Sequence, residues 1–185
     1  MRTLAAVALC CAILPASSLA AGSSSSGATQ TKTHSSSLPE LTAWQGRILQ
    51  KAISLIGEPY VWGGTSPNGM DCSGFVWRVY KLTSYAGAPQ LAGILQGRTA
   101  GDMSGEMPVS QRISIDNLQP GDVMFFANGN GPTSSPSQID HTGIYMGNGW
   151  FINSSRNGVA IAPLRGDEGS RFAWGRRPLA EAGLR

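Results

Sequence analysis

Two side chains in the central part of the chain could act together as a nucleophile and a base. Cys72 lies in the stretch NGMDCSGFV, between Asp71 and Ser73. If Asp71 is the N-cap of a helix, Cys72 occupies the first turn, where backbone N–H groups and the helix dipole lower the pKa of a thiol and can bind an oxyanion. Asp71 opposes this effect, because a carboxylate disfavours a neighbouring thiolate. We therefore expect a cationic partner for Cys72, and histidine is the usual one.

The chain offers few candidates for that partner. It contains two histidines, and His34 lies in a Ser/Thr-rich stretch that cannot hold a catalytic geometry. His141 begins the run HTGIYM and is therefore the expected general base for Cys72. The alternative is a structural histidine at a strand end. Elimination favours the base, because Cys72 and His141 are the one cysteine and the one histidine in the expected folded part.

A nucleophile and its base usually have a third group that orients the base. Asn153 follows His141 by 12 residues, across a turn built on GNG, so a hairpin would bring the two close. Its amide oxygen would accept the imidazole Nδ1–H and leave Nε2 facing the thiol. The alternative is an asparagine that bonds its own backbone at a strand end. Other nearby polar residues could take the role instead: Gln138, Asp140 and Asn148.

The first residues have the form of an export signal. Residues 1–20 combine an early positive charge, an apolar run too short to span a bilayer, and a small-x-small site ending at Ala20. We expect cleavage there; a lipoprotein anchored through Cys10 or Cys11 is the alternative. Cleavage leaves Cys72 as the only cysteine of the mature chain, so no intramolecular disulfide can form. A lone cysteine in an oxidising compartment is expected to be buried or used.

Composition excludes several classes of function. One cysteine and one histidine cannot form a zinc cluster, and a thioredoxin-type site needs a second cysteine. We expect no metal and no cofactor. Without its signal the chain carries 13 basic and 11 acidic side chains, too even a balance for nucleic-acid binding. We expect no membrane span, and a mildly basic surface suits an anionic polymer such as a bacterial wall.

Patterning along the chain divides it into four parts. Residues 1–20 are the signal. Residues 21–37 are Ser/Thr-rich and are expected to be a disordered tail. Residues 38–178 have the size of one ordinary domain, and residues 179–185 are expected to be a C-terminal tail.

Within the domain, helices are expected first and strands second. Apolar residues recur at helical spacing from Leu41 to Leu55, and again after Cys72. Residues 83–117 are Gly-rich and weakly periodic, which predicts a long loop with a short helix or strand, on the rim of a cleft. From Pro120 the runs DVMFFA, HTGIYM, WFIN and VAIA alternate with turn signals such as Asn-Gly. This order predicts an α+β fold with N-terminal helices packed on an antiparallel meander.

Several motifs, in order, resemble one known family. GEPYVWGGTSPNGMDCSGFVWRVY, LQPGDVMFF, DHTGIYMGNGWFINSS and RFAWGRRP are similar to segments of the NlpC family of cell-wall cysteine peptidases, from about Ile48 to Arg177. The resemblance implies a papain-like fold, with Cys72 as the nucleophile and His141 as the base. It also implies a polar third residue at Asn153, although that position is more often histidine in the family.

The resemblance implies further roles around the nucleophile. Tyr60 would lend its hydroxyl to the oxyanion or thiol region, or else pack on the barrel. Asp71 and Ser73 would line the site and contact the free amine of the substrate, a role for Asp71 that is compatible with N-capping. Trp62 and Trp174 are expected to be core residues.

The function expected from this resemblance is hydrolysis of amide bonds in peptidoglycan stem peptides or cross-links through a thioester. The protein would be a monomer, periplasmic or associated with the wall. One rival is an acyltransferase or amidase that uses the same fold on another substrate, such as a lipid. The other is a wall-binding module without activity.

Overall fold

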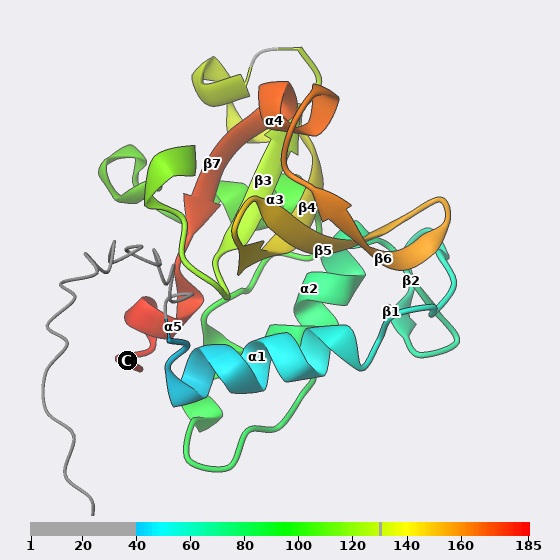
Figure 1. Cartoon of the computed structure of the whole chain (residues 1–185), viewed down its shortest axis with the longest axis vertical. Coiled ribbons are helices and arrows are strands. Elements are labelled where there is room, and N and C mark those ends of the chain that lie inside the picture. Colours follow the sequence, from blue (N-terminus) through cyan, green and yellow to red (C-terminus); the bar gives the residue numbers. More distant parts are fainter. Residues whose placement is uncertain (1–39, 130) are drawn as a thin grey trace, which may run out of the picture. The chain divides into compact units, whose positions relative to one another are not determined.

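The computed structural model describes residues 40–129 and 131–185, which belong to one compact unit spanning residues 38–185 (Figure 1). The expected signal peptide and the expected tail lie outside the described residues. Within the described part of the chain, no helix is long and apolar enough to cross a membrane.

Two helices form the layer that carries the nucleophile. The first, α1 (Ala43–Ile53), begins with a capping box in which Thr42 and Gln45 bond each other's backbone N–H. The second, α2 (Cys72–Tyr80), is capped by Asp71, as expected. Both helices turn apolar faces toward a shared core. Among its fully buried members are Ile48, Ala52, Phe75, Val76, Val79 and Tyr80.

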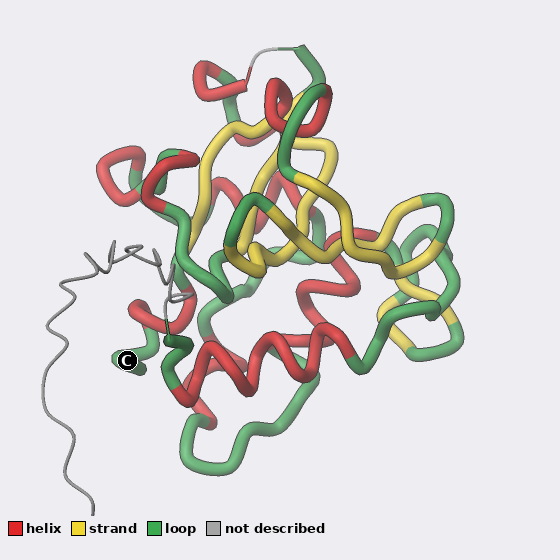
Figure 2. The backbone as a smooth tube through the Cα atoms, in the orientation of Figure 1, coloured by secondary structure: helices red, strands yellow, loops and turns green. Residues whose placement is uncertain are grey.

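A five-stranded antiparallel sheet forms the second layer, which confirms the α+β expectation (Figure 2). Its order is β6-β5-β4-β3-β7, so β7 joins the edge opposite β6 after the chain passes through a short helix. The elements are β3 (Val123–Ala127), β4 (Ile139–Gly147), β5 (Trp150–Ser155), β6 (Gly158–Pro163), α4 (Asp167–Arg171) and β7 (Phe172–Arg176).

The strand β3, which lies between β4 and β7, is buried on both faces of the sheet. Val123 and Phe125 belong to the core that includes the two helices, while Met124 and Phe126 pack with Phe151 on the other face. This alternation follows from the two-residue period of a strand. The sheet can therefore hold its register between two apolar layers.

The two Asn-Gly pairs make different turns. At Asn148 and Gly149 both φ angles are positive, 53° and 75°, as a two-residue type I′ hairpin requires. At the second pair only Gly158 is positive, at 86°, so this turn is not of type I′. A Cβ on Gly158 would lie 2.5 Å from the Glu58 carbonyl oxygen, so the hairpin end packs closely on the chain just before the nucleophile loop.

Residues 83–117 are more than a rim loop. They contain the short helix α3 (Ala100–Gly105) and three 3₁₀ turns. The short helix agrees with the prediction. Leu91, Leu95 and Met103 are at most 1% exposed, so part of this segment also belongs to the core. Its periodicity is weak because each helical piece is too short to show one. The 3₁₀ turns are η1 (Pro89–Gly93), η2 (Val109–Gln111) and η3 (Ile115–Asn117).

Smaller elements close the two ends of the domain. The short ribbon of β1 (Thr65–Ser66) and β2 (Gly69–Met70) precedes α2. The helix α5 (Pro178–Glu181) follows β7 and buries Leu179, and Leu184 packs against the same core. Residues that we expected to be a tail therefore contribute to the packing. Two 3₁₀ turns, η4 (Gly131–Thr133) and η5 (Pro136–Gln138), lie between β3 and β4.

Candidate active site

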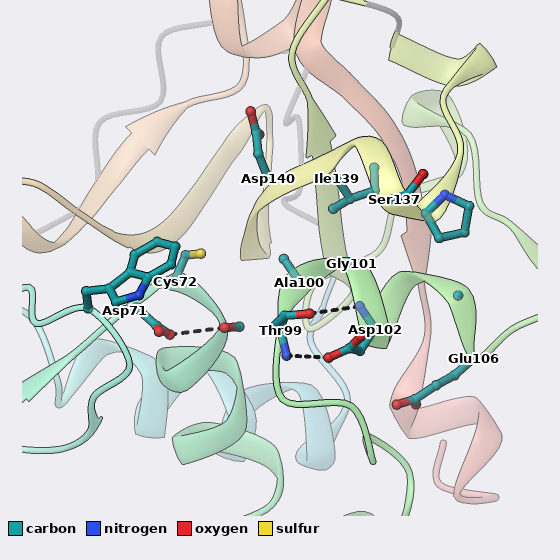
Figure 3. Close-up of a pocket in the computed structure, with 14 residues that line it drawn as sticks. Asp71, Cys72, Thr99, Ala100, Gly101, Asp102, Glu106, Ser137, Ile139 and Asp140 are labelled. Atoms are coloured by element: carbon teal, nitrogen blue, oxygen red, sulfur yellow. Dashed lines mark hydrogen bonds between the residues drawn. The ribbon is translucent and has the colours of Figure 1, made fainter.

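Cys72 lies at the start of α2 and borders a cavity. It is the first residue of the helix, and its side chain lines a cavity of about 800 Å³. Figure 3 shows the sulfur pointing into this cavity. The loop before β1, the helix α3 and the start of β4 supply the other walls. A substrate reaching the sulfur would therefore lie between α2 and α3.

Asp71 is saturated with hydrogen bonds. Its Oδ1 accepts from the Gly74 N–H at 2.6 Å, from the Ser73 hydroxyl at 3.0 Å and from Arg98 Nη1 at 3.1 Å. Its Oδ2 accepts from the Gly63 N–H and from Arg98 Nη2, both at 2.9 Å. A carboxylate offers about four lone-pair sites. Asp71 could therefore bind a substrate amine only by giving up one of these donors.

The pKa of the Cys72 thiol is raised rather than lowered. Burial is the main cause, since the residue is 8% exposed, and the Asp71 carboxylate adds to it. Backbone N–H groups of Thr142, Ser73 and Cys72 itself act in the opposite direction but do not outweigh the first two causes. The prediction of a lowered thiol pKa at the helix start was therefore wrong, because burial destabilises the thiolate more than the backbone N–H groups stabilise it.

His141 and Asn153 meet across the β4–β5 hairpin. His141 Nε2 lies 3.1 Å from Asn153 Oδ1. An amide oxygen can only accept, so Nε2 carries the hydrogen and Nδ1 is the free nitrogen. This corrects the expected tautomer, which had Nδ1 bonded to the asparagine. The ring also packs on Phe126, with centroids 5.7 Å apart.

The pKa of His141 is lowered. Burial of the ring is the main cause; the Asn153 hydrogen bond raises the pKa, the Arg171 charge lowers it and the Asp140 charge raises it. With the thiol pKa raised and the imidazole pKa lowered, the resting pair consists of a neutral thiol and a neutral imidazole. The ion pair expected from the sequence is not favoured in the empty site.

The strand β4 links the two halves of the site. The Thr142 N–H points at the Cys72 sulfur, and Thr142 is the next residue after His141. Asp140, on the other side of His141, lines both the Cys72 cavity and a second hollow of about 410 Å³ that contains His141 and Asn153. The Cys72 cavity and the hollow that contains His141 therefore share Asp140 as a lining residue.

Tyr60 and Ser73 also lie near the sulfur. Burial and the charges of Cys72 and Asp71 raise the pKa of Tyr60, while Arg156 lowers it, so the phenol is within electrostatic reach of the nucleophile. Ser73 lines the cavity and accepts a hydrogen bond from Arg98 Nη1 at 2.8 Å. Its hydroxyl donates to Asp71.

Close backbone packing fixes the loop before the nucleophile. A Cβ on Gly74 would lie 2.0 Å from the Gly64 carbonyl oxygen, and a Cβ on Gly64 would lie 2.4 Å from the Gly69 oxygen. These are contacts that only glycine allows. Both glycines therefore act as backbone spacers between the loop and the start of α2.

Two features of the site escaped the sequence analysis. Trp62, expected in the core, is 86% exposed and lines the Cys72 cavity, whereas Trp174 is buried as expected. Arg98, in the weakly periodic segment, reaches Asp71 and Ser73. The exposed Trp62 follows from its place in a Gly-rich loop, which lacks the strand alternation that would have assigned it a face. The only local signal for Arg98 was its position directly before Thr99, the N-cap of α3.

The described residues contain no group of three His, Cys, Asp or Glu side chains that could hold a metal ion. Fold and site together define the class: a papain-like α+β protein with a cysteine at a helix start and a histidine on the facing sheet.

The chain belongs to the NlpC/P60 family, whose model matches residues 57–177. It is 37% identical to murein DD-endopeptidase MepH of Escherichia coli over 132 residues, covering 70% of this chain and 44% of that protein. It therefore spans less than half of that relative, and smaller fractions of several others.

Solved structures share the fold. An NlpC/P60 family protein from Bacillus cereus has a TM-score of 0.58 at 30% identity, covering 77% of this chain and 42% of that one. RipD of Mycobacterium tuberculosis, described as a non-catalytic NlpC/p60 domain protein adapted to peptidoglycan binding, has a TM-score of 0.53 at 18% identity, covering 74% and 98%. At that identity the likeness to RipD concerns the fold alone.

Proposed function

We propose that this protein is a cysteine peptidase that hydrolyses amide bonds in the stem peptides or cross-links of peptidoglycan. The observation that carries the proposal is the position of Cys72 at the start of α2, facing an open cavity, with the His141–Asn153 pair on the adjacent strands. A module that only binds the wall would not need this combination.

In the first half of the reaction, the Cys72 thiol gives its proton to His141 Nδ1 as the sulfur attacks the amide carbonyl carbon. Proton transfer on attack suits a pair that rests in the neutral form. The backbone N–H groups at the start of α2 face the developing oxyanion, and the Tyr60 hydroxyl can assist. Asn153 holds the imidazolium through the hydrogen bond at Nε2.

In the second half, the tetrahedral intermediate expels its nitrogen, which takes the proton from His141 Nδ1 and leaves as an amine. The carbonyl carbon remains bound to sulfur as a thioester. His141 then removes a proton from water, and the resulting hydroxide attacks the thioester. The sulfur leaves and regains a proton from His141, which restores the neutral pair.

The relatives support the substrate class. MepH is named as a murein endopeptidase, and a mildly basic domain suits an anionic wall polymer. We propose that residues 1–20 direct export, that the mature chain acts in the periplasm or at the cell wall, and that it works as a monomer.

One experiment separates the proposal from its rivals. The purified protein and a Cys72→Ala variant are incubated with peptidoglycan, and the soluble fragments are identified by mass spectrometry. Stem-peptide fragments released by the parent alone support the peptidase. Sedimentation with the wall but no fragments from either protein points to a binding module. Wall left intact, with Cys72-dependent deacylation of a lipid or ester substrate, points to the acyltransferase or amidase.

A further inference from the structure

Arg98 connects the groups on both sides of the nucleophile. Its Nη1 donates to Asp71 Oδ1 at 3.1 Å and to Ser73 Oγ at 2.8 Å. Its Nη2 donates to Asp71 Oδ2 at 2.9 Å and to the Gly64 carbonyl oxygen at 3.2 Å. The guanidinium thus holds the residue before Cys72, the residue after it, and the loop packed on the helix start.

The Arg98–Asp71 pair is a strong interaction. It is bidentate, and the side chains are 29% and 9% exposed, so water screens the carboxylate poorly. Burial would raise the pKa of Asp71, but the hydrogen bonds from Arg98 and Gly74 and the Arg98 charge outweigh it, and the pKa is lowered. Asp71 is therefore ionised, and its negative charge lies one residue from the thiol.

The segment that carries Arg98 is itself anchored. Glu106 Oε1 accepts from the backbone N–H groups of Gln96 and Gly97, just before Arg98. Its Oε2 pairs with Arg176 Nη1 at 2.6 Å, and the Arg176 side chain is only 5% exposed. The guanidinium of Arg98 therefore extends from a fixed backbone and is not a loose surface side chain.

We propose that Arg98 is a positioning residue for the nucleophile: it neutralises the Asp71 carboxylate beside Cys72 and fixes Asp71 and Ser73 around the helix start. This role rests on the proposed function of Cys72 as a nucleophile. Without Arg98, Asp71 would repel the forming thiolate without compensation, and attack would require a higher pH.

The other charged groups around the cavity interact with partners other than Asp71. Asp140 and Glu106, which also line the cavity, already pair with Arg171 and Arg176. Arg156 acts on Tyr60. The titratable and charged groups that line the Cys72 cavity, or that act on Cys72 and its neighbours from other elements, are Tyr60, Arg98, Asp102, Glu106 and Asp140.

The test measures the pH dependence of thiol alkylation by iodoacetamide, which needs no substrate. The full chain carries Cys10→Ser and Cys11→Ser so that only Cys72 reacts. Arg98→Gln should move the midpoint of the rate–pH curve upward by about one unit or more, the usual effect of an uncompensated neighbouring charge. Arg98→Lys should restore part of the shift, and Asp71→Asn combined with Arg98→Gln should bring the midpoint back toward that of the parent.

Arg47→Gln on α1 is the matched control, because it makes the same change in net charge at a residue whose described hydrogen bond is to Ala86. It should leave the midpoint unchanged. The proposal is overturned if Arg98→Gln keeps the parental midpoint while folded, or if the double variant shifts as far as the single one. If the variants show the expected midpoint shifts but the parent protein cuts no peptidoglycan, the proposed function is overturned and the effect of Arg98 on the Cys72 thiol remains.

Discussion

The two halves of the site are held by different kinds of structure. Cys72 stands at a helix start surrounded by segments distant in sequence, and Arg98 reaches it from a chain of short helical pieces. His141 and Asn153 face each other across one hairpin, on neighbouring strands of a continuous sheet. The helix side is therefore an assembly of charges and close backbone contacts, whereas the sheet side is a product of strand register.

This difference divides the chemistry as well. On the helix side, burial and the Asp71 carboxylate disfavour the thiolate. In our proposal Arg98, bonded to Asp71, compensates for that carboxylate. The sheet side keeps the imidazole neutral through burial and holds its tautomer with one amide oxygen. Changes on the helix side should mainly affect thiolate formation, and changes on the sheet side should mainly affect proton transfer.

Removing the nucleophile should have the largest effect. Cys72→Ser should reduce peptidoglycan hydrolysis by several orders of magnitude, because a hydroxyl is far harder to deprotonate than a thiol. The melting temperature should stay close to that of the parent, since the two side chains have similar size. Fragment release by mass spectrometry and a thermal melt check both points. Undiminished hydrolysis would remove Cys72 from the mechanism.

On the sheet side, Asn153→Ala should lower kcat/KM by about ten- to a few-hundred-fold. The hydrogen bond that is lost serves a group that becomes charged, and such a bond contributes about 1.5–3 kcal/mol. Asn153→His should keep substantial activity, because an imidazole nitrogen can accept from His141 Nε2–H. Kinetics on a purified stem-peptide fragment measure both variants.

A different result would assign the orientation of His141 to another residue on the sheet side. If Asn153→Ala is fully active and mutation of Gln138, Asp140 or Asn148 causes the large loss instead, that residue is the third member. Asp140 lies beside His141 and lines both hollows, so it is the first of the three to test. The pairing of Cys72 with His141 would be unaffected.

At the rim of the helix side, Trp62→Ala should raise KM about fivefold and leave kcat unchanged. The side chain is 86% exposed beside the cavity, and covering part of it with substrate would contribute about 1 kcal/mol. Trp150→Ala, at another exposed tryptophan outside this cavity, is the control and should leave KM unchanged. Equal effects from the two variants would argue against contact between Trp62 and the substrate.

The smallest expected effect is a shift in pH dependence. Because the pKa of His141 is lowered, the acid limb of kcat/KM should lie below the ordinary histidine value of about 6.5. Arg171 contributes to this lowering and pairs with Asp140, so Arg171→Gln should raise the limb by less than about one unit. A pH–rate profile of each protein makes the measurement. A limb that moves downward in the variant would contradict the assigned electrostatics.

Much of the site could be predicted because its signals are local. Asp71 as an N-cap, the Asn148-Gly149 turn and the spacing of His141 and Asn153 each depend on a few neighbouring residues. The paired strands then convert a spacing of 12 residues into a contact of 3.1 Å. The choice of imidazole nitrogen was wrong, because it depends on the direction from which the ring meets its partner, and spacing along a strand does not contain that direction.

The sequence by itself determined the α+β order of elements, the candidate nucleophile and base, and the hairpin that joins the base to its orienting residue, since all of these follow from short-range periodicity and turn chemistry. Only the tertiary structure decided how costly the thiolate is, where Trp62 points, and which cation neutralises Asp71. Burial and long-range charge pairing set those properties. Both depend on segments brought together from far apart in the chain, such as Arg98 and Arg176, for which no local pattern exists.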